Sequence, residues 1–250
     1  MSLQQRPSND RLAREIAHHR EIAARAEVVW NWDSPSGRRR ADRRAAFFVT
    51  QGALAPGRSA LELGCGTGVF LRRVARSGAT IRGLDLSQDL LALARQELAS
   101  FLNVTLDCGN AEQLPYGNGS YDAVYGSSIL HHLDPLLALQ ETFRVLRSGG
   151  RLVFTEPNLL NPQVMAIFHL APAKPHLGVS PDERAFSRFR ALVWLRELGF
   201  RGVSVEPFDF LHPASPPRWM EAIDRLGALA ETVPLLRELA GSLLIRATRP

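Results

Sequence analysis

The sequence contains little cysteine, a single lysine and no long apolar run. Its two cysteines, Cys65 and Cys108, are too few and too far apart for a disulfide framework or a zinc ribbon, so we expect two small buried residues. No apolar run approaches the roughly 20 residues that a membrane-spanning helix needs, and the polar start of the chain does not resemble the apolar core of a signal peptide. These absences predict a cytoplasmic protein without a membrane span.

Basic residues are numerous, but almost all of them are arginine. The chain carries a net charge of +5, and Lys174 is the only lysine among 30 basic side chains. A dense run of arginines lies at 38–44, and a basic surface there would suit a nucleic-acid partner. The other arginines are scattered, and charge runs usually form solvated faces. Nucleic-acid binding is therefore kept as an alternative that the charge pattern disfavours.

Short apolar segments alternate with amphipathic segments along most of the chain. We expect strands at 59–63, 80–85, 103–110, 121–130, 151–158, 202–210 and 242–250. We expect helices at 10–32, 68–78, 87–101, 135–146, 182–200 and 216–230, with a short one near 164–170. Parallel neighbours need a helical crossover between them, so this alternation is typical of a parallel sheet with helices on both faces.

This order predicts an α/β fold, a doubly wound Rossmann-like sheet of seven mostly parallel strands flanked by helices. We expect residues 1–50 to form an N-terminal helical lid and residues 51–250 to form the ligand-binding domain. The segment at about 158–181 is rich in proline and is expected to be a loop insertion near the substrate.

The stretch LELGCGTG, residues 61–68, places glycines directly after the first predicted strand. Glycine is costly inside regular structure, so this cluster indicates a tight turn whose backbone comes close to a ligand. In an open parallel sheet, ligands bind beyond the carboxyl ends of the strands. Asp85 ends the second predicted strand, where a carboxylate can accept hydrogen bonds from a ribose diol. The two features together predict a nucleoside site.

From about Ala60 to Asn158 the chain resembles class I S-adenosylmethionine-dependent methyltransferases. The resemblance rests on ELGCGTG, GLDLS, GNAEQLPYGNGSYDAVYGSSILHHL and LRSGGRLVFTEPN. It implies that S-adenosyl-L-methionine is the cofactor and S-adenosyl-L-homocysteine the product. The cofactor-binding residues that it implies are Glu62 at the motif's acidic position, Gly64, Cys65, Gly66 and Gly68 at the turn, Asp85 and Leu86 at the ribose, Asn110, Ala111 and Glu112 at the adenine, and Ser127 and Ser128 near the sulfonium. Asn110 departs from the aspartate that often holds this position and adds no charge.

A dinucleotide-dependent oxidoreductase is the competing nucleotide-binding interpretation. Its turn has the pattern G-x-G-x-x-G, whereas this turn has G-C-G-T-G and lacks the third glycine at that spacing. The motif therefore favours a methyltransferase. A cofactor-binding subunit without catalytic activity is disfavoured because the glycine turn and Asp85 are both intact.

Three side chains after the fourth and fifth strands are candidates for a general base. Methyl transfer from a sulfonium needs a base only when the acceptor must lose a proton. His131, His132 and Glu156 could fill this role, although the histidines could also be packing residues and Glu156 could cap a neighbouring helix. No metal-ligand pattern follows the fourth strand, so we expect metal-independent chemistry.

The acceptor pocket is expected to come from aromatic segments outside the central motifs. These are Trp30 and Trp32, the 171–180 loop with His176, and the 208–217 segment with Phe208, Phe210 and His212. Such residues suit a small or lipid-like acceptor, for example a quinone, a natural product, a sugar or a glycolipid. An RNA or other nucleic-acid methyltransferase on the same fold stays as the alternative. Neither the acceptor atom nor the oligomeric state follows from the sequence.

Overall fold

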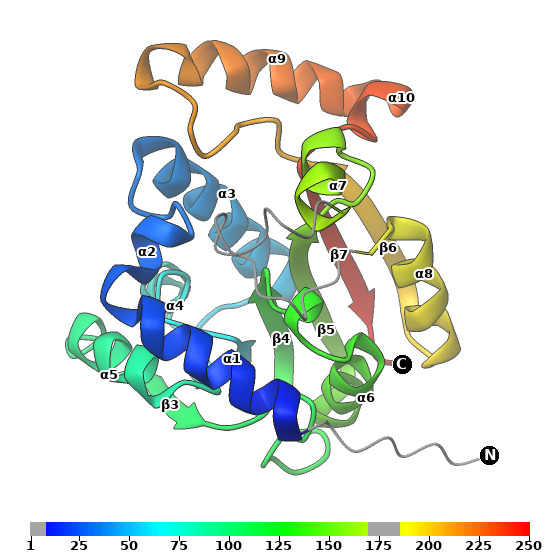
Figure 1. Ribbon diagram of the computed structural model, residues 1–250. Helices are drawn as coiled ribbons and strands as arrows, with labels where there is room; N and C mark the ends of the chain where they lie inside the picture. The colour runs from blue at the N-terminus through cyan, green and yellow to red at the C-terminus, as the bar shows by residue number, and fades with distance from the viewer. Residues whose placement is uncertain (1–8, 170–185) are drawn as a thin grey trace.

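Seven strands form one sheet in the order β3-β2-β1-β4-β5-β7-β6 in the computed structural model, which describes residues 9–169 and 186–250 (Figure 1). The strands are β1 Ser59–Leu63, β2 Thr80–Asp85, β3 Val104–Cys108, β4 Tyr121–Ser127, β5 Leu146–Pro157, β6 Arg201–Phe208 and β7 Ser242–Thr248. Strands β1 to β5 pair in parallel, and β7 runs antiparallel to both of its neighbours. The predicted doubly wound, mostly parallel sheet of seven strands is confirmed.

The helices lie on both faces of the sheet and at its carboxyl edge. They are α1 Asn9–Ile22, α2 Ala26–Val29, α3 Pro35–Gly52, α4 Leu71–Val74, α5 Gln88–Glu97, α6 Pro135–Val145, α7 Pro162–His169, α8 Arg188–Glu197, α9 Met220–Thr232 and α10 Pro234–Arg237. In Figure 1, α1 crosses in front of the sheet beside α5, and α9 and α10 lie at the top of the molecule beyond α3 and α7.

Both faces of the central strands are buried, which explains their continuous apolar runs. Ala60 of β1 joins a core cluster with side chains of α3, α4 and α5, whereas Leu61 joins a second cluster with side chains of α6 and α8. Successive side chains of a strand point to opposite faces, so the alternation requires a helical layer on each side. Polar caps fix where the helices start: the hydroxyl of Ser87 accepts from the amide of Leu90 at the start of α5, and Asp134 caps α6 in the same way.

Several predicted elements differ from the structure in their limits, and three of the differences affect the site or the sheet. The predicted helix 10–32 is broken into α1, a 3-10 turn at 23–25 and α2. The predicted strand 121–130 ends at Ser127, after which the chain turns into a 3-10 helix at 130–132. Strand β5 begins at Leu146, where a strand start at Arg151 was predicted, because Leu146 leaves the helix in an extended conformation and pairs with Tyr121 before a register shift.

Helix α3 was not predicted, and it changes the role of the N-terminal segment. It crosses residue 50, where the boundary between lid and domain was predicted. Its residues Ala41, Ala45 and Phe48 are buried in the core cluster beneath β1 and β4. The N-terminal segment therefore contributes both to the cover of the site and to the core itself.

One of the two cysteines is not buried as predicted. Cys65 is buried at the turn after β1, but Cys108 is exposed. Cys108 ends β3, the edge strand of the sheet, which has a neighbouring strand, β2, on one side alone.

Candidate functional site

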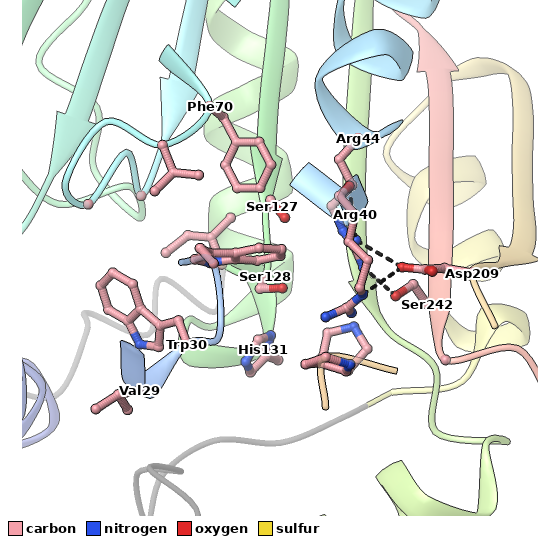
Figure 2. Close-up of a pocket in the computed structure, with 18 of the residues that line it drawn as sticks. Val29, Trp30, Arg40, Arg44, Phe70, Ser127, Ser128, His131, Asp209 and Ser242 are labelled. Carbon is pink, nitrogen blue, oxygen red and sulfur yellow. Dashed lines mark hydrogen bonds and ion pairs between the residues drawn. The ribbon is translucent and has the colours of Figure 1, made fainter. Parts of the chain in front are cut away.

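The carboxyl ends of β1, β2, β4 and β5 surround a cavity of about 400 Å³ (Figure 2). Its lining comes from segments that are distant in the sequence, and it includes Trp30, Gly66, Asp85, Ser128 and His131. A cavity at this edge follows from the topology, because β2 leads to one side of β1 and β4 lies on the other.

The glycine turn after β1 adopts backbone conformations that side chains rarely adopt. The φ angles of Gly64, Gly66 and Gly68 are 66°, 51° and 87°. A Cβ on Gly64 would lie 2.5 Å from the side chain of Ile129, and a Cβ on Gly66 would lie 3.3 Å from the indole of Trp30. Gly64, Cys65 and Gly66 line the cavity, whereas Gly68 packs against α5 outside its lining. The turn therefore brings bare backbone to the cavity wall.

Asp85 holds this turn and lines the cavity with the same carboxylate. Its Oδ2 accepts from the amide of Gly66 at 2.8 Å, and its Oδ1 accepts from the amide of Ser87 at 2.9 Å. A carboxylate can accept about four hydrogen bonds, so each oxygen can accept one more. The arrangement suits a diol presented from the cavity.

A second, smaller hollow of about 40 Å³ adjoins the cavity on the far side of Asp85. Leu86, Asn110 and Ala111 line it together with residues of α1. Glu112 does not line it, because its carboxylate accepts from the amide of Asp134 and forms an ion pair with Arg11 of α1. Among the residues predicted for the adenine side, Glu112 therefore fastens the helix that closes this hollow.

Glu62 lies in the core and not in the lining of either cavity. The residue is 1% exposed and is located beside Tyr125, and burial raises its pKa well above the ordinary value. The acidic residue of the motif therefore lies next to the glycine turn in the sequence, but its side chain is buried and does not reach either cavity.

Ser127 and Ser128 form the floor of the cavity at the end of β4 (Figure 2). The hydroxyl of Ser127 accepts from Thr155 Oγ1 at 3.0 Å. Ser128 has a φ of 55°, which is costly for a residue other than glycine, and its amide donates to the carbonyl of Thr155. This bend turns the chain from β4 toward the histidines.

His131 is held against the cavity by Glu156. Glu156 is 1% exposed, and its Oε1 accepts from the amides of Ile129 and Leu130, both at 2.9 Å. Its Oε2 lies 2.8 Å from Nδ1 of His131. The carboxylate only accepts, so Nδ1 carries the proton and Nε2 is the basic nitrogen of the neutral ring. One oxygen of Glu156 thus holds the backbone at the start of the 3-10 turn, as the capping alternative predicted, and the other holds the ring of His131.

His132 lies between the cavity and the N-terminal helix. Its Nδ1 is 3.4 Å from Oε2 of Glu15 on α1, and its ring lies near that of His19. Burial lowers the pKa of His19, which lines both cavities. His132 therefore contacts α1 through Glu15.

The wall opposite the glycine turn was not anticipated from the sequence. Arg40 and Arg44 line it from α3, and Asp209 lines it from the loop after β6 (Figure 2). Trp32, Phe210 and His212 also line the cavity as predicted, whereas Phe208 is buried under Arg43 and Arg44, and His176 lies outside the described residues. Spacing of arginines one helical turn apart, at 40 and 44, is the signal that could have indicated a shared face.

The arginine run at 38–44 does not form a free basic face. Arg39 pairs with Asp224, Arg43 with Glu231, and Arg40 and Arg44 with Asp209. Three carboxylates thus pair with four of the five arginines in the run, which weakens the support that the run gave to a nucleic-acid partner, while the net charge of +5 is unchanged.

Comparisons with known proteins agree with this geometry. A family model described as a methyltransferase domain matches residues 61–154. A demethylmenaquinone methyltransferase of Bacillus mycoides (strain KBAB4) is 30% identical over 179 residues, covering 62% of this chain and 75% of that protein. The chain belongs to the S-adenosylmethionine-dependent methyltransferase family.

Solved structures share the fold of this methyltransferase. A geranyl diphosphate C-methyltransferase from Streptomyces coelicolor A3(2), crystallised with Mg²⁺, geranyl diphosphate and S-adenosyl-L-homocysteine, has a TM-score of 0.63 at 20% identity and covers 85% of this chain and 80% of that chain. The [4+2]-cyclase SpnF has a TM-score of 0.60 at 24% identity and covers 84% and 80%. At these identities the likeness shows the fold alone, and the cyclase illustrates that the fold does not fix the reaction.

Matches to other curated relatives are shorter. Several of them are also demethylmenaquinone methyltransferases, and the matched segments span 31% to 62% of the relatives' lengths. The family model, too, covers only residues 61–154. The acceptor side of this methyltransferase must therefore be inferred from its own residues.

S-adenosylmethionine is the cofactor of this family, and the residues present fit it. The glycine turn presents bare backbone to the cavity, and Asp85 has acceptor capacity for the ribose diol. Leu86, Asn110 and Ala111 line the hollow beyond it, on the side expected for the adenine.

No group of three metal-ligating side chains occurs in the described part of the chain. Nor does any described helix have the length and apolarity to cross a bilayer.

Arg11 is expected to control how firmly α1 closes over the cofactor. Its guanidinium donates to the carbonyl of His132 at 2.5 Å and pairs with the buried carboxylate of Glu112. We expect Arg11→Ala to speed the dissociation of S-adenosylhomocysteine by about 10-fold, since a lost charged hydrogen bond costs about 1 to 3 kcal/mol. Stopped-flow displacement measures this rate.

The matched control is Arg20→Ala on the same helix, which removes an exposed pair with Asp89. It should leave the dissociation rate unchanged, because exposed ion pairs contribute little. Equal rates for wild type and Arg11→Ala would show that α1 does not close the site through this pair.

Proposed function

We propose that this protein transfers a methyl group from S-adenosylmethionine to a small-molecule acceptor by in-line displacement. The observation that carries the proposal is the cavity at the carboxyl edge, where the glycine turn and Asp85 lie on one side and a buried histidine on the other. The bound cofactor supplies an activated methyl group with a good leaving group. The work left to the chain is to position the acceptor, exclude water and remove a proton.

The lining of the cavity favours a planar, largely apolar acceptor such as a quinol or an aromatic natural product. Trp30, Trp32 and Phe70 present aromatic surface to it, and apolar pockets with a few placed polar groups are typical of small-molecule sites. Demethylmenaquinone methyltransferases among the relatives support an aromatic acceptor of this kind. Sugars and glycolipids suit this wall less well.

His131 is the proposed general base. Glu156 fixes its Nδ1 proton, so Nε2 can take the proton from an acceptor hydroxyl or carbon acid as the nucleophile attacks. The carboxylate of Glu156 then stabilises the imidazolium through the same hydrogen bond. His132 is proposed to hold the lid helix through Glu15 and not to act on the acceptor. Because this pair supplies the base, we propose chemistry that does not depend on a metal.

Titration calorimetry with S-adenosylmethionine, S-adenosylhomocysteine and NAD tests the cofactor. Micromolar binding of the two sulfur nucleosides without NAD is expected. Methyl uptake is then measured with a panel of naphthols, quinols and catechols in the presence and absence of EDTA, and activity is expected to persist with EDTA. Tight cofactor binding without methyl uptake by any acceptor would contradict the proposed reaction, whereas binding of NAD alone would contradict the site.

A further inference from the structure

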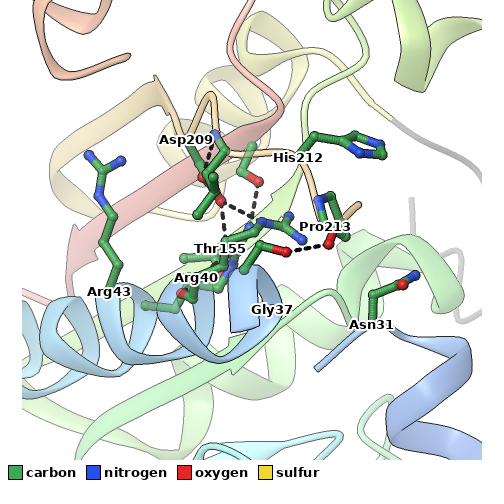
Figure 3. A network of polar contacts seen from close by, with 12 residues as sticks. Asn31, Gly37, Arg40, Arg43, Thr155, Asp209, His212 and Pro213 are labelled. Atoms are coloured by element: carbon green, nitrogen blue, oxygen red, sulfur yellow. Dashed lines mark hydrogen bonds and ion pairs between the residues drawn. The ribbon is translucent and has the colours of Figure 1, made fainter. Parts of the chain in front are cut away.

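The acceptor end of the cavity carries one positive charge more than its own carboxylate neutralises. Arg40 Nε and Arg44 Nη1 both pair with Oδ2 of Asp209, at 3.0 Å and 2.9 Å (Figures 2 and 3). Asp85 is the other acidic residue among the described residues that line this cavity, and it belongs to the cofactor side. Two guanidinium groups therefore share one carboxylate.

Neighbouring acidic groups are already engaged. Glu231 pairs with Arg43 at 2.5 Å and also accepts from the amide of Asp209 at 2.8 Å. In Figure 3 Arg43 points away from Arg40 and Asp209. His212 adds no negative charge, and burial together with Arg40 lowers its pKa. Within residues 9–169 and 186–250, no further carboxylate therefore cancels the extra charge.

The guanidinium groups have hydrogen-bonding capacity that the described residues do not use. Arg44 is 2% exposed, and its Nε is buried without a partner among these residues. Arg40 is bonded within this part of the chain through Nε, which leaves Nη1 and Nη2 to donate elsewhere. Burial and the charge of Arg40 lower the pKa of Arg44 to about 10. Arg44 shares its carboxylate, Asp209, with Arg40, and a buried cation that is only partly neutralised is costly.

We propose that Arg40 and Arg44 form a subsite for a carboxylate group of the methyl acceptor. This inference rests on the proposed function and narrows its substrate class to aromatic acids. The uncompensated charge is one, which a carboxylate matches and a phosphate monoester, at about −1.5 to −2, exceeds. Nη1 and Nη2 of Arg40 form a fork that fits the two oxygens of a carboxylate, whereas in Arg44 these atoms already bond to Ser242, Asp209 and the carbonyl of Arg40, which leaves its Nε to donate.

The placement of the subsite agrees with the direction of the reaction. In Figure 2, Ser128 and His131 lie between Trp30 and the wall that contains Arg40, Asp209 and Ser242. An acid anchored at this wall extends its ring along the aromatic lining and brings its far hydroxyl or carbon toward His131. The subsite thereby fixes which atom of the acceptor faces the methyl group.

The test uses 6-hydroxy-2-naphthoate, its neutral amide, and 6-hydroxy-2-naphthyl phosphate, titrated into the full chain with and without S-adenosylhomocysteine. The wild type is expected to bind the acid at least about 10-fold more tightly than the amide, in line with one charged hydrogen-bonded pair. Arg40→Gln is expected to reduce this preference to less than about 3-fold. Its melting temperature and its affinity for S-adenosylhomocysteine should match those of the wild type.

Arg39→Gln is the control, because Arg39 lies on the same helix but pairs with Asp224 and does not line the cavity. It should retain the full preference for the acid. The subsite is disproved if the wild type shows no preference for the acid over the amide, or if it prefers the phosphate. Loss of S-adenosylhomocysteine binding with the acid preference intact would instead refute the proposed cofactor site and leave the anion subsite standing.

Discussion

Replacing His131 with alanine is expected to lower turnover by about 10²- to 10⁴-fold, the usual contribution of a general base. The reason is the pair with Glu156, whose buried carboxylate lies 2.8 Å from Nδ1 and leaves Nε2 as the proposed base. The affinity for S-adenosylhomocysteine should stay within about twofold, since the ring is not part of the glycine turn or the ribose carboxylate. Turnover of the best acceptor and calorimetry with the product measure the two effects.

Glu156→Gln separates orientation of the base from its presence. Glutamine can still accept from the amides of Ile129 and Leu130, but it carries no charge to stabilise the imidazolium. We expect turnover to fall by about 10- to 100-fold, less than for His131→Ala. His18→Ala, which changes a histidine outside both cavities, should have no effect. Normal turnover in His131→Ala would remove the base from the mechanism.

The nucleoside half of the site could be predicted because its geometry is local. Gly64, Gly66 and Asp85 follow strands whose apolar pattern is plain, and parallel strands end at one edge. The order of the strands therefore places the glycine turn beside the carboxylate of Asp85. Their hydrogen bond, from the amide of Gly66 to Asp85, is a direct consequence of two neighbouring strands.

The acceptor half could not be predicted because its residues meet only in the folded chain. Arg40 and Arg44 looked like part of a solvated charge run, and only α3 packing under the loop after β6 pairs them with Asp209. The interruption of the predicted helix 10–32 after α1 also depends on tertiary packing. Amphipathic spacing continues through residues 23–25, but the chain bends there and brings Trp30 over Gly66. Tertiary packing overrides the local pattern at both places.

The dual role of Glu156 shows a further limit of sequence analysis. A carboxylate before proline suggested either a cap or a catalytic group, and these were weighed as alternatives. In the structure one oxygen caps the 3-10 turn and the other holds His131. These contacts of Glu156 cannot be read from its neighbours in the sequence, because Glu156 lies in β5 and the turn that it holds follows β4.

Asp85→Ala is expected to weaken binding of S-adenosylhomocysteine by more than about 100-fold. A hydrogen bond to a charged group contributes about 1.5 to 3 kcal/mol, and about 1.4 kcal/mol corresponds to a factor of ten in affinity. The carboxylate has a second task, because it also holds the amides of Gly66 and Ser87. Its loss therefore both removes the ribose acceptor and releases the glycine turn, so the melting temperature should fall as well.

Asp85→Asn distinguishes the two contributions. Asparagine retains one carbonyl oxygen to accept from an amide, so it should preserve more of the turn than alanine and lose the charge toward the ribose. We expect a loss of affinity of about 10- to 100-fold with a smaller change in melting temperature. Asp107→Asn is the control, because Asp107 lies on the next strand and pairs with Arg82 outside both cavities. If Asp85→Asn bound the product as tightly as the wild type, the carboxylate would serve only the turn, and the nucleoside would have to be held by other groups at this edge of the sheet.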